Sequence, residues 1–382
     1  PSSAASDVYK RQTCDSAFRK WNVVLISVES LSASFLKYFG SDQNITPVLD
    51  SLIPHGLFFT NMYASGTRTV RGLEALSLAI PPTPGQSVVR RPHNENLGSM
   101  GSVLASKGYD VRYIYGGNSF FDNMGYFFSN NGYRVVDRRD IPDTDIHHET
   151  AWGVADEDAF AVALKACSES YAANHPFFSH IMTVSNHRPY TYPEGRIDIP
   201  PSRQVREGAV KYTDYAIGRF LQDCSRQPWY ANTLFVIVAD HCAKSAGKVA
   251  LPYKEFHIPC LVYNPSLVKP AIHSGLASQI DLVPTILGMM NTPYQSAFLG
   301  YDLFKVRPEN ARAFISTYES MGFMKADTLV VLSPQSRVSA FKIDSSGNYL
   351  PVTVRGALLD EAIAWFQGTY AMIKAKQQRN KE

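Results

Sequence analysis

The chain has 382 residues, of which 45% are hydrophobic and 19% are charged, and its 37 Lys and Arg residues against 34 Asp and Glu residues give a formal charge of +3. This composition is that of a globular protein of one large domain or two smaller ones, and it excludes collagen, coiled coil and global disorder. The charge is too small to indicate binding to nucleic acid.

Residues 1–18 are expected to form a linker or a sequence remnant outside the fold. The opening Pro-Ser-Ser-Ala-Ala-Ser lacks the charged segment followed by an apolar segment that marks a signal peptide. No apolar run approaches the roughly 18 residues that cross a bilayer. We therefore expect the chain to be a fragment, with any targeting or membrane segment upstream of Pro1. The five cysteines form no Cys-x-x-Cys pair and no zinc spacing.

From residue 22 onward the sequence alternates between strand and helix patterns. Pro47 favours the first turn of the first helix, and Gly108 is typical of the residue that ends a helix. The alternation predicts an α/β fold with a mostly parallel sheet sandwiched by helices. The predicted strands cover residues 22–27, 57–61, 110–115, 177–184, 233–239 and 260–263. The predicted helices cover residues 46–54, 70–79, 97–107, 156–173, 205–224 and 279–290.

The C-terminal part has a different pattern. Residues 314–342 contain three short β-type segments, which predict a small antiparallel appendage, and residues 357–376 predict a closing helix. We expect residues 19–310 to form the catalytic domain, with residues 311–382 packed on that same domain.

Acidic and imidazole side chains follow the predicted strands where these end. Glu29 follows the first strand, His187 the fourth, and Asp240 with His241 the fifth. Ligands of open α/β sheets bind beyond the carboxyl ends of the strands, so parallel strands would direct these side chains into one crevice. Carboxylates with imidazole suit Mn²⁺, Mg²⁺ or Zn²⁺. Singly, each has a structural alternative as a cap, an Asx turn or a loop residue; their shared position favours a metal site.

Thr69 is the candidate nucleophile, because it lies where a predicted helix begins. Free N–H groups and the helix dipole favour an anion there, and a hydroxyl on a divalent cation becomes a usable nucleophile. Arg68 and Arg71 flank Thr69 and are candidates for holding phosphate oxygens. The structural alternative is that Thr69 only caps the helix.

Six ordered motifs carry a resemblance to a known family: NVVLISVES at 22–30, TPVLD at 46–50, GTRT at 66–69, SNH at 185–187, VADH at 238–241 and SQIDLVPT at 278–285. With these, the chain from about residue 20 to about residue 345 resembles the sulfatase-like, alkaline phosphatase superfamily. Within that superfamily it looks like the extracytoplasmic domain of lipoteichoic-acid-synthase-type phosphoglycerol transferases.

The resemblance implies a site and a reaction. Glu29, Thr69, Asp240 and His241 would hold Mn²⁺, or Mg²⁺ as in some members, and His187 would contact the head group. Thr69 would attack phosphatidylglycerol, release diacylglycerol and carry glycerol phosphate to a hydroxyl of a glycan or polyglycerol-phosphate acceptor. The resemblance also implies the periplasmic face of a bacterial inner membrane, with membrane association through an N-terminal segment outside this chain.

The chain also departs from that family. The loop at 118–123 lacks the Trp and Arg of the Gram-positive synthases. The basic stretch after His241 looks like Gram-negative relatives, so Lys244 and His257 are further candidates for substrate contact, with core or surface packing as the alternative for His257. No sulfatase Cys/Ser-x-Pro-x-Arg motif stands at Thr69, and a second metal lacks matched positions. Phosphoethanolamine transfer, phosphodiester hydrolysis and a non-catalytic lipid-sensing domain stay open as alternatives.

Overall fold

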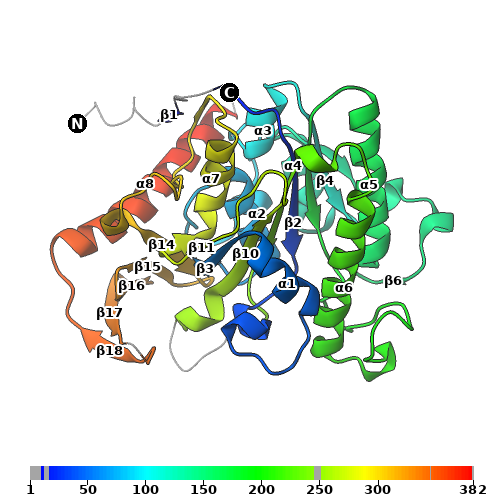
Figure 1. The fold of residues 1–382 in the computed structure, drawn as a ribbon. Coiled ribbons are helices and arrows are strands. Elements are labelled where there is room, and N and C mark those ends of the chain that lie inside the picture. The colour runs from blue at the N-terminus through cyan, green and yellow to red at the C-terminus, as the bar shows by residue number, and fades with distance from the viewer. Residues whose placement is uncertain (1–9, 13–16, 245–250, 345, 381–382) are drawn as a thin grey trace.

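A computed structural model describes residues 10–12, 17–244, 251–344 and 346–380. Within these residues, nine strands form the central sheet, in the order β11–β3–β10–β9–β2–β8–β4–β5, with β12 paired to β3 (Figure 1). Their bounds are β2 Asn22–Val28, β3 Leu57–Tyr63, β4 Asp110–Tyr115, β5 Arg134–Val136, β8 Phe177–Met182, β9 Thr233–Ala239, β10 His257–Tyr263, β11 Ala271–His273 and β12 Ala277–Ser278.

The central sheet is mostly parallel, as the sequence predicts. β2 pairs in parallel with β8 and β9, and β4 pairs in parallel with β8 and β5. β10 is antiparallel to both of its neighbours, β9 and β3, so β3 again points the same way as β2. Every residue of β2, β8 and β9 is buried, which is the pattern of strands covered on both faces. The carboxyl ends of β2, β3, β8 and β9 therefore meet at one edge.

Two layers of helices cover this sheet (Figure 1). α6 packs against α1 and α5 in one layer, and α2 packs against α3 and α7 in the other. The predicted third helix is shorter than expected, because Ser99 forms a capping box with Ser102 and so starts α3 at Met100. The helices are α1 Pro47–Leu52, α2 Thr69–Leu78, α3 Met100–Ala105, α4 Met124–Ser129, α5 Asp156–Ala172, α6 Arg206–Cys224, α7 Leu282–Met289 and α8 Ala357–Arg379.

The C-terminal part forms a second, antiparallel sheet under α8. It has five strands in the described residues, in sequential order, where the sequence predicts three. They are β14 Arg312–Ser316, β15 Met321–Lys325, β16 Thr328–Ser333, β17 Arg337–Ile343 and β18 Tyr349–Val352. Phe314 of this sheet, Phe366 of α8 and Ala75 of α2 share one hydrophobic cluster. Ser316 Oγ also donates a hydrogen bond to Ser65 O at 2.7 Å, so β14 supports the loop before α2.

Two short strand pairs complete the fold. β1 (Lys10–Gln12) pairs with β13 (Tyr294–Ser296), so part of the expected linker forms a strand; residues 1–9 and 13–16 lie outside the described residues. β6 (Glu149–Thr150) and β7 (Gly153–Val154) form a hairpin. In the part of the chain that the structure describes, no helix combines the length and the apolar character that a bilayer span requires.

Candidate active site

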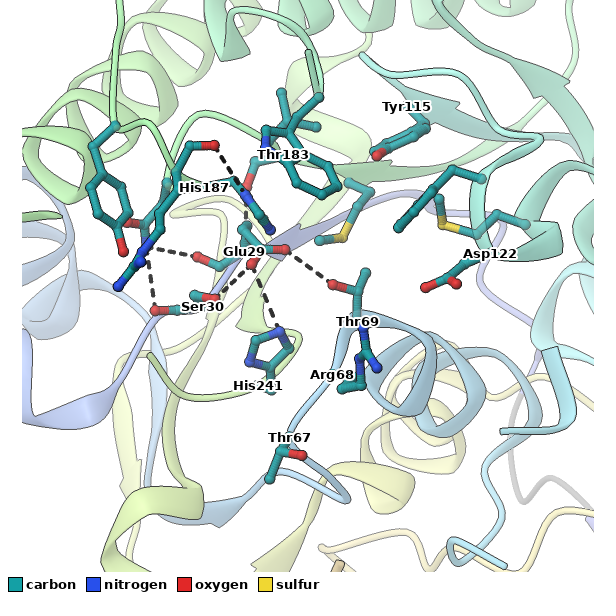
Figure 2. A pocket seen from close by; sticks show the side chains of 18 of the residues that line it. Glu29, Ser30, Thr67, Arg68, Thr69, Tyr115, Asp122, Thr183, His187 and His241 are labelled. Carbon is teal, nitrogen blue, oxygen red and sulfur yellow. Dashed lines mark hydrogen bonds and ion pairs between the residues drawn. The ribbon is translucent and has the colours of Figure 1, made fainter. Parts of the chain in front are cut away.

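A cavity of about 300 Å³ opens at the carboxyl edge of the central sheet (Figure 2). Glu29 reaches it from the end of β2, Thr69 from the start of α2, and His241 from the end of β9. His187 reaches it from the loop after β8. The parallel sheet thus brings together side chains that lie up to 212 residues apart in the sequence.

Glu29 is held by the turn that ends β2. Its amide donates to Thr183 Oγ1 at 2.9 Å, and Asn186 Nδ2 donates to its carbonyl at 2.9 Å. Ser30 follows with a φ of 52°, in the left-handed region, and this turn lets its hydroxyl donate to Glu29 Oε1 at 2.6 Å. The Ser30 amide donates to Asp240 Oδ1 at 2.8 Å. Strain of this kind at Ser30 is common where a chain positions functional groups.

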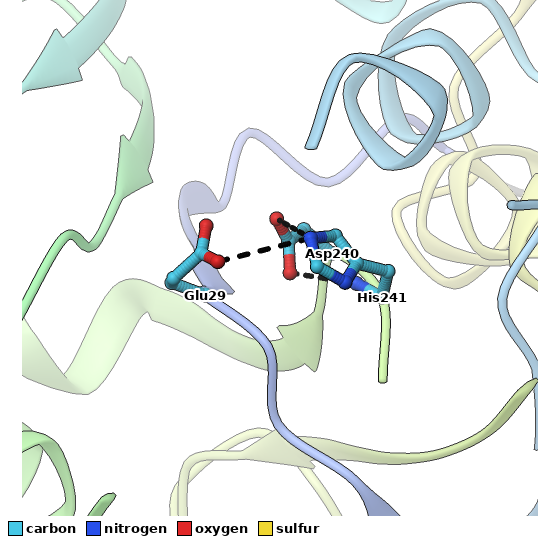
Figure 3. A group of neighbouring side chains, drawn as sticks. All are labelled: Glu29, Asp240 and His241. Atoms are coloured by element: carbon cyan, nitrogen blue, oxygen red, sulfur yellow. Dashed lines mark hydrogen bonds and ion pairs between the residues drawn. The ribbon is translucent and has the colours of Figure 1, made fainter. Parts of the chain in front are cut away.

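Asp240 and His241 lie against Glu29 (Figure 3). Asp240 Oδ1 accepts hydrogen bonds from the Ser30 and His241 amides, whereas the buried Oδ2 has no hydrogen-bond partner among the described residues. His241 Nδ1 lies 2.8 Å from Cys242 O and so carries the proton. His241 Nε2 faces the two carboxylates, 3.4 Å from Asp240 Oδ2 and 3.7 Å from Glu29 Oε1.

The charges of Glu29 and Asp240, next to His241, favour binding of a cation. Burial and the neighbouring Glu29 raise the pKa of Asp240 to about 7. Burial alone would lower the pKa of His241, but the carboxylates of Asp240 and Glu29 outweigh it and raise that pKa. Two adjacent buried carboxylates are unfavourable without a positive partner. One ligand atom from each of the three residues lies within 4.8 Å of the others, and Asp240 Oδ2 is unsatisfied, so oxygen and nitrogen donors fit Mn²⁺, Mg²⁺ or Zn²⁺.

Thr69 is the first residue of α2, and its hydroxyl donates to Glu29 Oε2 at 3.1 Å (Figure 2). The capping alternative is wrong, because Arg68 occupies the N-cap position and has no side-chain cap bond. Gly72 lets α2 come this close: a Cβ at that position would lie 2.3 Å from Asp240 O. The sequence therefore places the Thr69 hydroxyl beside the three candidate ligands, where it bonds to Glu29 instead of capping α2.

The structure separates the remaining candidates into two groups. Arg68 and His187 line the cavity, and the His187 ring lies 3.8 Å from the Trp152 ring, centroid to centroid. Trp152 stands in the β6–β7 hairpin, a pairing across two residues that sequence reasoning did not predict. Asn186 lies within the SNH motif, which is the signal that could have identified its role in holding Glu29.

Arg71, Lys244 and His257 do not line the cavity. Arg71 is two residues beyond Thr69, so it points about 200° around the helix. Its buried guanidinium pairs with Glu74 at 3.0 Å and donates to Thr83 O at 2.6 Å.

His257 takes its packing alternative: its Nε2 lies 2.9 Å from Thr60 O, and its ring packs on Phe39 and Tyr63. Lys244 is exposed and adjoins residues 245–250, which lie outside the described residues.

The sequence of the chain is similar to that of a known family and of two named bacterial proteins. The sulfatase family profile matches residues 21–292. The chain is 28% identical to phosphoglycerol transferase I of Salmonella arizonae over 354 residues, which cover 87% of this chain and 45% of that protein. It is 22% identical to lipoteichoic acid synthase 2 of Bacillus subtilis over 294 residues, which cover 70% of this chain and 44% of that protein. The chain thus spans less than half the length of these curated relatives.

Solved structures agree with this placement. A protein in the alkaline phosphatase superfamily from Vibrio parahaemolyticus is similar with a TM-score of 0.91 and 34% identity, covering 97% of this chain and 91% of that one. The lipoteichoic acid synthase LtaP from Listeria monocytogenes is similar with a TM-score of 0.75 and 18% identity, covering 100% of this chain and 95% of that one. The second likeness shows the fold alone.

Proposed function

The chain belongs to the sulfatase family, within the alkaline phosphatase superfamily, and on that premise we propose that it is a metal-dependent phosphoglycerol transferase acting on phosphatidylglycerol. The observation that carries the proposal is the 3.1 Å hydrogen bond from Thr69 Oγ1 to Glu29 Oε2, beside Asp240 and His241. It supports the proposal because it brings the Thr69 hydroxyl, the proposed nucleophile, next to the candidate cation ligands. The names of the relatives in Salmonella and Bacillus support glycerol phosphate as the transferred group.

Glu29, Thr69, Asp240 and His241 would hold the cation, Mn²⁺ in our proposal, with Mg²⁺ or Zn²⁺ as alternatives. When bound, the cation supplies positive charge that favours the ionised hydroxyl and offsets charge on the phosphoryl oxygens. The Cys242 carbonyl keeps the proton of His241 on Nδ1 and so keeps Nε2 free as a donor atom. Ser30 fixes one oxygen of Glu29 and leaves the other facing Thr69.

The reaction proceeds in two displacements. Thr69 Oγ1 forms a bond to the phosphorus of the lipid, the bond from phosphorus to the diacylglycerol oxygen breaks, and the proton directed at Glu29 Oε2 leaves with that oxygen. The glycerol phosphate is then covalently attached to Thr69. An acceptor hydroxyl attacks the same phosphorus, the bond to Oγ1 breaks, and the acceptor proton returns to Thr69. No net proton is consumed.

Arg68 and His187 are the proposed contacts for the head group, since both line the cavity next to Thr69. The acceptor is a hydroxyl of a glycan or of a glycerol-phosphate polymer. The reaction would take place at the periplasmic face of a bacterial inner membrane, where the donor lipid is found, with a segment upstream of this chain providing membrane attachment.

Phosphoethanolamine transfer is the second candidate, favoured by one observation. Asp122 lines the cavity, and Figure 2 places it across Thr69 from Glu29. A carboxylate there would suit an ammonium head group better than a glycerol. Asp122 Oδ1 is however 3.3 Å from Arg90 Nε, and this ion pair offsets its charge. Phosphodiester hydrolysis would follow if water replaced the acceptor hydroxyl.

The decisive experiment is turnover of fluorescent phosphatidylglycerol with and without Mn²⁺, for wild type, Thr69→Ala and Thr69→Ser. We expect metal-dependent release of diacylglycerol that Thr69→Ala abolishes and Thr69→Ser retains in part. Full turnover by Thr69→Ala would overturn the mechanism. Parallel reactions with phosphatidylethanolamine separate the two head groups, and release from neither lipid would favour a non-catalytic domain.

A further inference from the structure

Arg206, the first residue of α6, lines the cavity on a different element from the candidate cation ligands. Its Nη1 is buried and has no hydrogen-bond partner among the described residues. No carboxylate of the described residues forms an ion pair with it, and its guanidinium lies over the Tyr190 ring at 5.1 Å from the ring centroid. The packing therefore holds this guanidinium in place and leaves its Nη1 without a partner.

A buried guanidinium nitrogen without a partner is costly, because arginine keeps its proton and every N–H group is a donor. The cavity's own carboxylates do not serve it. Glu29 is engaged with Ser30, Thr69 and His241, and Asp122 is engaged with Arg90. Arg68 and Arg188 also line the cavity, but both are exposed, so water can satisfy their guanidinium groups. Arg206 alone among these arginines has a buried nitrogen that lacks a partner in the described part of the chain.

We infer that Arg206 binds a phosphate oxygen of the ligand in this cavity and completes its hydrogen bonding only when that ligand is present. The inference rests on the proposed function and deepens it, since the proposed ligand is a phosphodiester next to Thr69. Guanidinium is the side chain best suited to phosphate oxygens, through parallel N–H donors and a charge that does not titrate. The phosphate belongs either to the donor lipid or to a glycerol-phosphate acceptor.

The first test is binding of glycerol phosphate to the Mn²⁺-loaded protein by calorimetry. We expect Arg206→Gln to weaken binding by about tenfold or more, and Arg206→Lys to recover part of the loss. Arg203→Gln is the matched control, because Arg203 is exposed, lies three residues before Arg206 and does not line the cavity. Wild-type affinity in Arg206→Gln would overturn the inference.

Thermal stability distinguishes a role of Arg206 in ligand binding from a purely structural role. Arg206→Met retains an apolar stem against Tyr190 and removes the unpaired charge, so we expect its Tm to equal or exceed that of wild type while glycerol phosphate binding falls. A lower Tm together with unchanged binding would overturn the inference. This variant also keeps the test informative if Arg206→Gln does not fold.

Kinetics then assign the source of the phosphate. A raised KM for phosphatidylglycerol in the first half-reaction places the donor phosphate at Arg206. A change only in transfer to added acceptor places the acceptor phosphate there. If wild type binds glycerol phosphate through Arg206 but releases diacylglycerol from no lipid, the transferase proposal fails and the assignment of Arg206 stands. If wild type binds no glycerol phosphate, both fail.

Discussion

Thr69 Oγ1 donates a hydrogen bond to Glu29 Oε2 across 3.1 Å, and this contact joins the start of α2 to the end of β2. The two residues belong to different strand–helix units, so their approach depends on β2 and β3 pointing the same way with β9 and β10 between them. Asp240, at the end of β9, is brought to the same point. The approach of the proposed nucleophile to the proposed cation ligands is thus a consequence of sheet topology.

Asp240→Asn should separate cation binding from folding. The variant keeps a side-chain oxygen that can accept from the Ser30 and His241 amides but loses the charge. At a Mn²⁺ concentration 100 times Kd, wild type should gain about 2.7 kcal/mol of stability. Asp240→Asn should gain almost none. Thermal unfolding with and without Mn²⁺ measures this, and an equal gain in both proteins would contradict the assignment of Asp240 as a ligand.

The same variant should show a defined pH dependence in metal-free protein. Burial and Glu29 raise the folded-state pKa of Asp240 from 3.8 to about 7, so between these values the folded state binds more protons than the unfolded state. Stability from this group is therefore present below about pH 4 and is lost as pH rises through about 7. The stability of Asp240→Asn relative to wild type should increase over that range.

Denaturant titrations at several pH values provide the measurement. Asp214→Asn is the control: burial also raises the pKa of Asp214 to about 7, but that carboxylate accepts from the Val48 and Leu49 amides, away from the cavity. Adding Mn²⁺ should suppress the pH-dependent difference at Asp240 and leave that at Asp214. A difference at Asp240 that is flat with pH would contradict the prediction.

Arg68 and Arg71 should respond in opposite ways to alanine substitution. Arg71→Ala leaves Glu74 buried without its ion-pair partner, so we expect a stability loss of about 3–5 kcal/mol. Arg68→Ala should leave stability within about 0.5 kcal/mol, because the residue is exposed, and should raise KM for the lipid. Chemical denaturation and steady-state kinetics on both variants check this. The reverse pattern would place Arg71, not Arg68, in the site.

Gly72→Ala should disturb the site through the backbone. The added Cβ would lie 2.3 Å from Asp240 O, so α2 must move away from β9, at a cost of about 1–3 kcal/mol and with loss of turnover. Gly368→Ala, in α8, is the matched control, because no atom lies within 4 Å of its added Cβ. It should stabilise the protein by about 0.5–1 kcal/mol. Equal stability of the two variants would contradict the close approach.

Sequence reasoning predicts the central sheet well because its signals are local. β2 and β9 are continuous apolar runs that stop at Glu29 and at Asp240, and their parallel pairing is confirmed. The resemblance to the sulfatase-like superfamily is confirmed as well. The structure brings Glu29, Asp240 and His241 together, while their roles in catalysis stay predictions.

What the sequence does not predict depends on contacts between distant segments. The antiparallel direction of β10 is not encoded in its apolar run, and β18 continues the C-terminal sheet beyond residue 342, where the predicted β segments end. Arg71 lies two residues from Thr69 in the sequence but does not line the cavity, because the helix turns its side chain away toward Glu74. Arg206 belongs to no recognised sequence motif. Only the structure shows that its Nη1 is buried without a hydrogen-bond partner.

The packing of the C-terminal sheet on α2 determines how this protein can be shortened. A chain cut after about residue 310 would lose Phe314 and Phe366 and so expose Ala75, which packs in the same cluster. It would also lose the hydrogen bond from Ser316 to the loop that leads to Thr69. The exposed apolar face would favour aggregation, and without that hydrogen bond the loop before Thr69 would be less firmly positioned. A fragment made for crystallisation or assay therefore has to extend through α8, which ends at residue 379.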